Sequence, residues 1–127
     1  MEYSKDDLFK ARIVALILNG RVDDALEELA RYYHIDKPRL LIKRVKGHSK
    51  VPALYSFKDK TIYIQNGEYY TNPFVILHEF YHHLRNIGGR HRGTEYKANE
   101  FAREYINTFN KIIKLFKKAD IESEVER

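Results

Sequence analysis

The sequence has no cysteine, which excludes a disulfide framework and any metal site built on thiolates. A metal bound by this chain must use histidine, aspartate, glutamate or water, and that donor set is more typical of catalytic than of structural sites. Methionine occurs only once. These two depletions favour a cytoplasmic protein, and they are also a feature of heat-adapted proteins.

Long hydrophobic runs are lacking as well. The longest, residues 13–18, is far shorter than the roughly 20 apolar residues that span a bilayer, so we expect no membrane partner. Residues 1–10 show no secretory pattern, and we expect no targeting segment. With 127 residues, 43% hydrophobic and 32% charged, the chain suits one globular domain over residues 1–127.

Basic residues exceed acidic ones, which gives a net charge of +5 and a pI of about 9.3. They fall in three separate stretches, residues 39–50, 85–92 and 111–118, each mixed with apolar residues. A basic domain can bind nucleic acid, anionic surfaces or acidic peptides. Because no single tract collects the charge, the pattern favours a solvated lysine-rich surface over a dedicated nucleic-acid face, which stays open as an alternative.

Two helices are predicted in the first quarter of the chain. Residues 4–19 have Ser4 as a candidate N-cap and Gly20 directly after their end. Residues 22–33 carry a stripe of apolar side chains at helical spacing. Both segments therefore have the start and stop signals, or the periodicity, of helices that pack on a core.

A small three-stranded sheet is predicted next. Pro38 ends the helical pattern, and residues 40–45 are rich in β-forming side chains. Two further short strands are expected at residues 53–57 and 61–65, and their spacing indicates a hairpin.

Two more helices are predicted in the second half. Thr71 or Asn72 can cap a helix over residues 73–86, and residues 87–93 then form a glycine-rich loop. Thr94 can cap a long last helix.

That helix is expected to run to about residue 118, and the charged residues 120–127 are expected to fray. The order of helices, small sheet and two more helices predicts an α+β fold rather than alternating βαβ units.

The third predicted helix carries the run His78-Glu79-Phe80-Tyr81-His82. At about 100° per residue, His78 and His82 lie about 40° apart on one helical face, so both imidazoles can reach one ion. Glu79 is turned by about 100°, beside the ion, where it can accept a proton from an attacking water. His83 is turned too far from His82 to join the same ion. This HExxH pattern predicts a zinc site with Glu79 as general base.

A catalytic zinc needs a third protein ligand, and the downstream candidates are His91, Glu95, Glu100 and Glu104. Periodicity places Glu95 at the edge of the apolar stripe of the last helix, whereas Glu100 and Glu104 fall on the solvent side. A carboxylate on a core-facing stripe is unusual without a partner, and a metal would provide one. We therefore predict Glu95 as the third ligand; an exposed first-turn carboxylate favoured by the helix dipole is the alternative.

His91 is the rival third ligand. Its neighbours Arg90 and Arg92 are cationic, which disfavours a second cation at the same place. Asn99, on the same helix face as Glu95, can hydrogen-bond a ligand histidine. An oxyanion formed in the reaction also needs a donor, and the sequence leaves several candidates. They are Tyr69, Tyr70, Tyr81, His83, His91 and Tyr105.

His78-Glu79-x-x-His82 followed by Glu95-x-x-Ala98-Asn99 resembles the gluzincin metallopeptidases, in particular the very small minigluzincins, over roughly residues 22–116. It is also similar to the zincin domain of peptidases that cleave repressors. The resemblance implies a minimal zincin fold that hydrolyses peptide or protein substrates. It implies one Zn²⁺ on His78, His82 and Glu95, with Glu79 as the base.

Two further expectations come from the resemblance. Residues 61–65 look like the upper-rim strand that pairs with an extended substrate. Latent forms, in which a terminal segment fills the cleft, are associated with minigluzincins, so residues 1–20 or 119–127 are candidate regulatory segments.

The sequence also departs from the pattern. The gap between His82 and Glu95 is short for the repressor-cleaving group. Residues 25–43 only faintly suggest a helix-turn-helix, because β-forming residues follow, so no repressor substrate is assigned.

Two alternatives stay open. In related zincins that act on DNA-bound proteins a histidine replaces the glutamate, which would give His91 the ligand role. The second alternative is no enzyme but a small basic module for nucleic acid or a partner, with a structural or vestigial metal site. A homo-oligomer is also conceivable for a small unit with a sheet edge.

Overall fold

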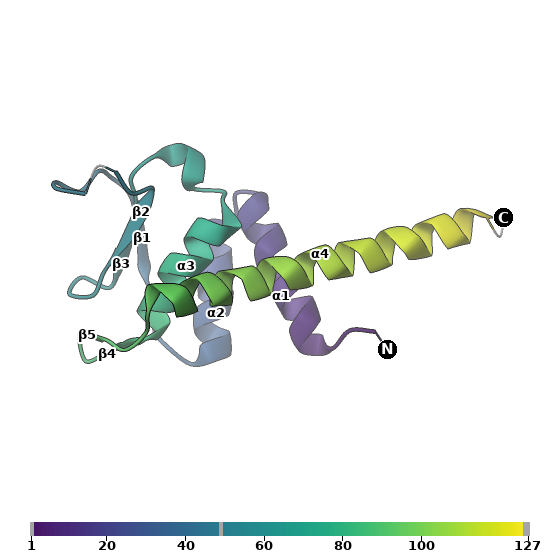
Figure 1. The fold of residues 1–127 in the computed structure, drawn as a ribbon, viewed down its shortest axis with the longest axis horizontal. Helices are drawn as coiled ribbons and strands as arrows, with labels where there is room; N and C mark the ends of the chain where they lie inside the picture. The colour runs from purple at the N-terminus through teal and green to yellow at the C-terminus, as the bar shows by residue number, and fades with distance from the viewer. Residues whose placement is uncertain (1, 49, 126–127) are drawn as a thin grey trace.

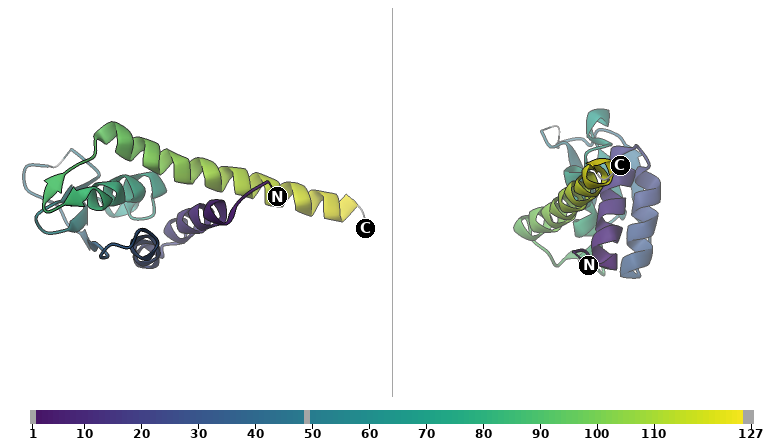
Figure 2. Two further views of the ribbon diagram at one scale, coloured as in Figure 1. Left: turned by 90° about the horizontal axis from the view of Figure 1, so that it is seen from below. Right: turned by 90° about the vertical axis from the view of Figure 1, so that its right-hand side faces the viewer.

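The computed structural model describes residues 2–48 and 50–125 and confirms the α+β class. The α-helices of these residues are α1 (Lys5–Leu18), α2 (Val22–Tyr33), α3 (Pro73–Leu84) and α4 (Glu95–Val125). α1 packs against α2 and α4, and α3 lies between α4 and a small sheet (Figures 1 and 2). Within the described part of the chain, no helix combines the length and apolarity needed to cross a bilayer.

The first two helices begin and end where the sequence predicts. Ser4 Oγ accepts a hydrogen bond from the Asp7 backbone, and the Asp7 carboxylate accepts one from the Ser4 backbone, both at 3.1 Å. This reciprocal capping box satisfies two of the free N–H groups at the start of α1. α2 ends at Tyr33, and the following residue, His34, caps it in the left-handed conformation with φ of 58°. The apolar stripes of both helices are buried in the core.

The sheet has the order β1 (Arg39–Ile42), β3 (Thr61–Ile64), β2 (Ala53–Ser56). β2 and β3 form the predicted antiparallel hairpin, and β1 runs parallel to β3. The expectation that residues 61–65 form the upper-rim strand is wrong, because β3 is the central strand and both of its edges are paired. β1 and β2 have the free edges instead, and β2 is the edge strand that packs against α3.

The first strand is shorter than predicted, because it ends at Ile42 and not at residue 45. The Val45 backbone N–H donates to Gln65 Oε1 at 2.7 Å and is therefore satisfied by a side chain, not by the sheet ladder. Gln65 Nε2 donates to the carbonyls of Val51, at 2.8 Å, and His48. Gln65 thus holds the loop between β1 and β2 against the end of β3.

The segment after α3 is more ordered than the loop predicted for residues 87–93. α3 ends at Leu84, and β4 (Asn86–Ile87) pairs with β5 (Arg90–His91) in a two-stranded ribbon. Gly88 and Gly89 have φ values of 61° and 79°, which a two-residue hairpin turn requires and side chains disfavour. The ribbon fixes the position of His91 beside α3.

The last helix is longer than predicted, since α4 continues through Val125 and residues 119–125 do not fray. They contain neither glycine nor proline to end a helix, and residues 126–127 lie outside the described part. Thr94 caps α4 as expected, with its Oγ1 accepting from the Lys97 backbone at 3.1 Å. α4 starts beside α3, crosses α1, and projects beyond the rest of the chain (Figures 1 and 2).

Candidate metal centre

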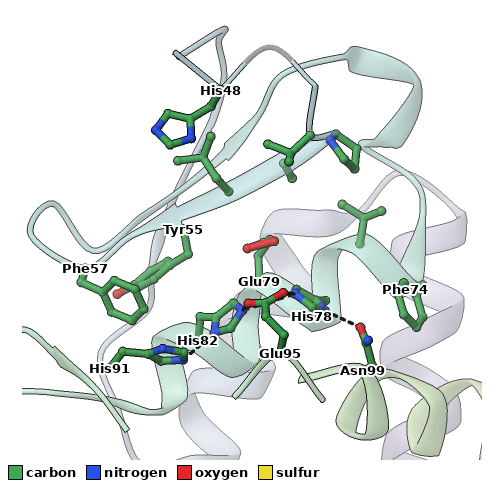
Figure 3. Close-up of a pocket in the computed structure, with 15 residues that line it drawn as sticks. His48, Tyr55, Phe57, Phe74, His78, Glu79, His82, His91, Glu95 and Asn99 are labelled. Carbon is green, nitrogen blue, oxygen red and sulfur yellow. Dashed lines mark hydrogen bonds and ion pairs between the residues drawn. The ribbon is translucent and has the colours of Figure 1, made fainter. Parts of the chain in front are cut away.

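α3 is placed so that one face enters the core and another faces the start of α4. Asn72 Oδ1 accepts from the Val75 backbone at 3.2 Å, and Pro73 occupies the first turn, where no N–H donor is needed. Leu77 and Phe80 are fully buried and anchor the helix. This orientation leaves His78 and His82 facing α4 (Figure 3).

The structure brings three donor groups together. His78 Nε2 lies 3.2 Å from His82 Nε2, and the Glu95 carboxylate lies 3.0 Å from the former and 2.7 Å from the latter. Four-coordinate ions with bonds of about 2.0 Å hold their ligand atoms about 3.3 Å apart. The two imidazoles and the carboxylate have the chemistry of ligands to one divalent ion, and they lie up to about 0.6 Å closer together than such an ion would hold them. His78, Glu79 and His82 form a group close enough for metal binding.

Glu95 reaches the histidines, but the environment predicted for it is wrong. Its side chain is 74% exposed, so it lies at the open mouth of the site and not on a core-facing stripe. As the first residue of α4 it also benefits from the positive end of the helix dipole. Glu100 and Glu104 are solvent-exposed, as predicted.

Asn99 orients His78. Its Oδ1 lies 2.8 Å from His78 Nδ1, so it accepts the proton of that nitrogen and turns Nε2 toward Glu95, 3.0 Å away. A metal-binding histidine ordinarily donates its second N–H to an oxygen in this way. The role predicted for Asn99 therefore fits its position.

His91 lies on the far side of His82. Its Nε2 is 2.9 Å from His82 Nδ1, whereas His82 Nε2 faces Glu95. His91 therefore contacts the His82 nitrogen that points away from the donor cluster. The ring of Phe57 covers the His91 ring at a centroid distance of 4.8 Å. Glu95, and not His91, is therefore the residue that lies beside the two nitrogens that face each other.

Glu79 is a buried carboxylate beside these donors. It is 7% exposed and points into the cleft between α3 and the sheet (Figure 3). Burial raises the pKa of Glu79 to about 8, and the negative charge of Glu95 adds to the effect. A carboxyl group with such a pKa can exchange a proton near neutral pH.

Burial also disfavours the charged form of His82. It lowers the pKa of His82; Glu95 opposes this shift, and His78 and His91 reinforce it. A neutral imidazole is the form that binds metal ions. His83 serves another purpose, because its Nε2 donates to the Asp36 carbonyl at 2.7 Å and its Nδ1 accepts from the Tyr55 hydroxyl at 2.6 Å. As predicted, His83 does not join the donor cluster.

The donor cluster lies at the floor of a cleft of about 460 Å³. One wall is β2, and the loop that carries His48 lies above it (Figure 3). Phe57 and Phe74 line the cleft as well. No sequence pattern indicates a role for His48, Phe57 or Phe74, because a loop and the ends of two elements place them there.

Most of the predicted oxyanion donors lie elsewhere. Of the six candidates only His91 lines the cleft, and Tyr105 is bonded to Tyr33 in the helical core, 2.6 Å between hydroxyl oxygens. His48 and Tyr55 are cleft residues with polar rings that the prediction missed, and the Tyr55 hydroxyl is bonded to His83.

The terminal segments lie outside the cleft. α1 buries its apolar face in the core, and no residue of α1 lines the cleft. α4 leads away from the site, since 31 helical residues at about 1.5 Å each place Val125 about 45 Å from Glu95. The cleft is open in this structure, and regulation by residues 1–20 or 119–127 stays a prediction.

Comparisons with known proteins leave the chemistry of this site as the basis for assigning a function. No protein-family model, curated protein or solved structure matches the chain. The HExxH spacing and the donor cluster that it forms are therefore the informative features.

Gly93 is expected to be sensitive to substitution, because it lets the chain pass close to α3. A Cβ atom at this position would lie 2.5 Å from Tyr81 Cε1, so Gly93→Ala must displace either the ring or the start of α4. We expect destabilisation by about 1–3 kcal/mol, measured by urea unfolding, together with weaker metal binding. Gly67→Ala, where a Cβ meets nothing within 4 Å, is the control. Equal stability of the two variants would contradict the packing described.

Proposed function

We propose that this chain is a zinc-dependent metallopeptidase of the small gluzincin type. The observation that carries the proposal is the convergence of His78, His82 and Glu95 within 2.7–3.2 Å of one another at the floor of an open cleft. The HExxH spacing and the downstream Glu95-x-x-Ala98-Asn99 resemble minigluzincins, which supports the same assignment.

The donor set fits zinc in a catalytic site. Two imidazole nitrogens and one carboxylate are one of the ligand sets of zinc peptidases, and they leave a fourth position open. The cleft beside Glu95 gives a substrate access to that position. A structural zinc would instead be enclosed by four protein ligands.

Glu79 performs the proton transfers in the proposed reaction. Zinc, when bound, acidifies a water and polarises the carbonyl of the scissile peptide. Glu79 accepts a proton from the attacking water and returns it to the leaving amine. Its buried position keeps bulk water from competing for that proton. Asn99 and His91 hold the rings of His78 and His82 in the orientation required.

The substrate is proposed to bind in an extended conformation along the free edge of β2. This edge has unpaired backbone groups and lies above the donor cluster, and a peptide that pairs with it presents its carbonyls toward α3. β2 is thus the proposed substrate-pairing strand, in place of residues 61–65, which the resemblance indicated.

Zinc content and affinity test this proposal. Wild type purified without chelator is expected to bind one zinc per chain, and Glu95→Ala is expected to bind it more than about 100-fold more weakly, beyond the 10–100-fold typical of residues that only support a ligand. Glu100→Ala removes an exposed carboxylate from the same helix and should keep wild-type affinity. Full zinc retention in Glu95→Ala would move the third ligand elsewhere, and a wild type that binds no zinc would end the proposal.

A further inference from the structure

The charges of this chain are distributed unevenly over the fold. Residues 39–103 contain twelve lysines and arginines against five aspartates and glutamates, which leaves eleven against thirteen in the rest of the chain. The segment that builds the sheet, the cleft and the donor cluster thus carries a net charge of +7, and the remaining residues carry −2. The overall charge of +5 hides this separation.

The basic side chains also differ in their partners. In the helical part, Lys10, Arg12 and Lys111 form ion pairs that join α1 to α4 or α2. Around the cleft, no ion pair with a described residue neutralises five exposed cations, which we call the rim cations. They are Arg44, Lys50, Lys58, Arg90 and Arg92.

The rim cations lie at both ends of β2. Arg44 and Lys50 share a surface pocket with Val51 and Pro52, which line the cleft where β2 begins. Lys58 follows the other end of β2, just after Phe57, and Arg90 and Arg92 flank His91, whose ring lies against that of Phe57. Two basic stretches that are far apart in the sequence are thereby gathered around one cleft.

Few acidic groups offset this charge. Of the five acidic residues in the segment, Glu95 is one of the donors and Glu79 stands beside them, where a bound cation would compensate both charges. Glu100 pairs with Lys97, and the Asp59 carboxylate accepts from Ser56, which leaves Glu68 as the fifth. An extended chain that follows β2 therefore meets unpaired positive charge before and after the donor cluster.

We propose that the cleft selects acidic polypeptide segments, with glutamate or aspartate on both sides of the bond that lies over the donor cluster. This inference rests on the proposed function and names the substrate class of the same site. The four residues of β2 span about 13 Å, so the acidic positions are expected two to four residues from that bond on either side. The free strand edge and the apolar side chains Leu54 and Phe74 favour an extended peptide over a nucleic acid.

The test uses two fluorescein-labelled peptides with one apolar centre, flanked on both sides by three glutamates or three lysines. Binding is measured by fluorescence anisotropy to zinc-loaded Glu79→Gln, so that no turnover is needed. At low salt we expect the glutamate peptide to bind at least about 10-fold tighter, with the difference shrinking as ionic strength rises. Charge reversal at one end, Arg44→Glu with Lys50→Glu, or at the other, Arg90→Glu with Arg92→Glu, should abolish the preference.

Lys114→Glu with Lys117→Glu is the matched control, because it makes the same charge change on the exposed second half of α4 and should keep the preference. Equal binding of both peptides would overturn the inference, and so would preferential capture of a single-stranded oligonucleotide. The proposed function fails separately: acidic preference without any hydrolysis by wild type would refute the peptidase and keep the inference. Hydrolysis of both peptides at the same rate would support the peptidase and refute the preference for acidic segments.

Discussion

Replacing Glu79 with glutamine is expected to lower the rate of peptide hydrolysis by about 10²–10⁴-fold while the zinc content stays that of wild type. Glu79 stands next to His78, His82 and Glu95 without being one of these three converging residues, so we expect its loss to remove proton transfer and not metal binding. The amide keeps nearly the same shape and fits the same buried space. Hydrolysis rate and zinc content are measured on the same preparation.

The same variant has a second readout in the metal-free chain. Burial raises the pKa of Glu79 from 4.5 to about 8, so between these values the folded state binds a proton that the unfolded state releases. The stability of metal-free wild type should therefore fall between about pH 5 and pH 8, and this part of the decrease should be missing in Glu79→Gln. Unchanged hydrolysis by Glu79→Gln, or loss of its zinc, would refute the role as base.

Phe80→Ala is expected to destabilise the fold by about 3–5 kcal/mol, because it deletes a large side chain that is 0% exposed. Phe80 follows Glu79 on α3 and packs against Tyr33 and Phe101, with ring-centroid distances of 6.1 and 6.4 Å. Such a loss corresponds to a decrease in melting temperature of roughly 10–20 °C for a domain of this size. Thermal and urea unfolding measure it.

Phe116→Ala is the matched control for the size of the deletion. Phe116 lies on the projecting half of α4 and is 47% exposed, so its truncation should cost less than about 1 kcal/mol. If both variants lost the same stability, the core would not be organised around α3 as described.

The helices were the part of the fold that the sequence predicted best. Ser4, Asn72 and Thr94 all accept the hydrogen bonds expected of N-caps, because these signals act within a few residues. Strand order was not predictable in this way. Nothing local in residues 61–64 reveals that β1 pairs with their second edge, since that pairing depends on how the chain returns after α2.

Individual site residues could be predicted only where helical periodicity determines which side chains share one face. The four-residue spacing put His78 and His82 on one face, and the periodicity of α4 picked Glu95 over Glu100 and Glu104. The burial of Glu95 was mispredicted, because exposure depends on how far the two helices diverge at the cleft mouth. His48 could not be predicted, since its position follows from the contacts of Gln65 with the loop.

The position of Glu95 on a different helix from the two histidines has a thermodynamic consequence. His82 and Glu95 are 13 residues apart in the chain, and an ion held by both acts as a reversible cross-link between α3 and α4. Since only the folded chain presents these donors together, each 100-fold excess of free ion over its dissociation constant adds about 2.7 kcal/mol to stability. The melting temperature of this small protein would thus serve as a gauge of the free metal around it.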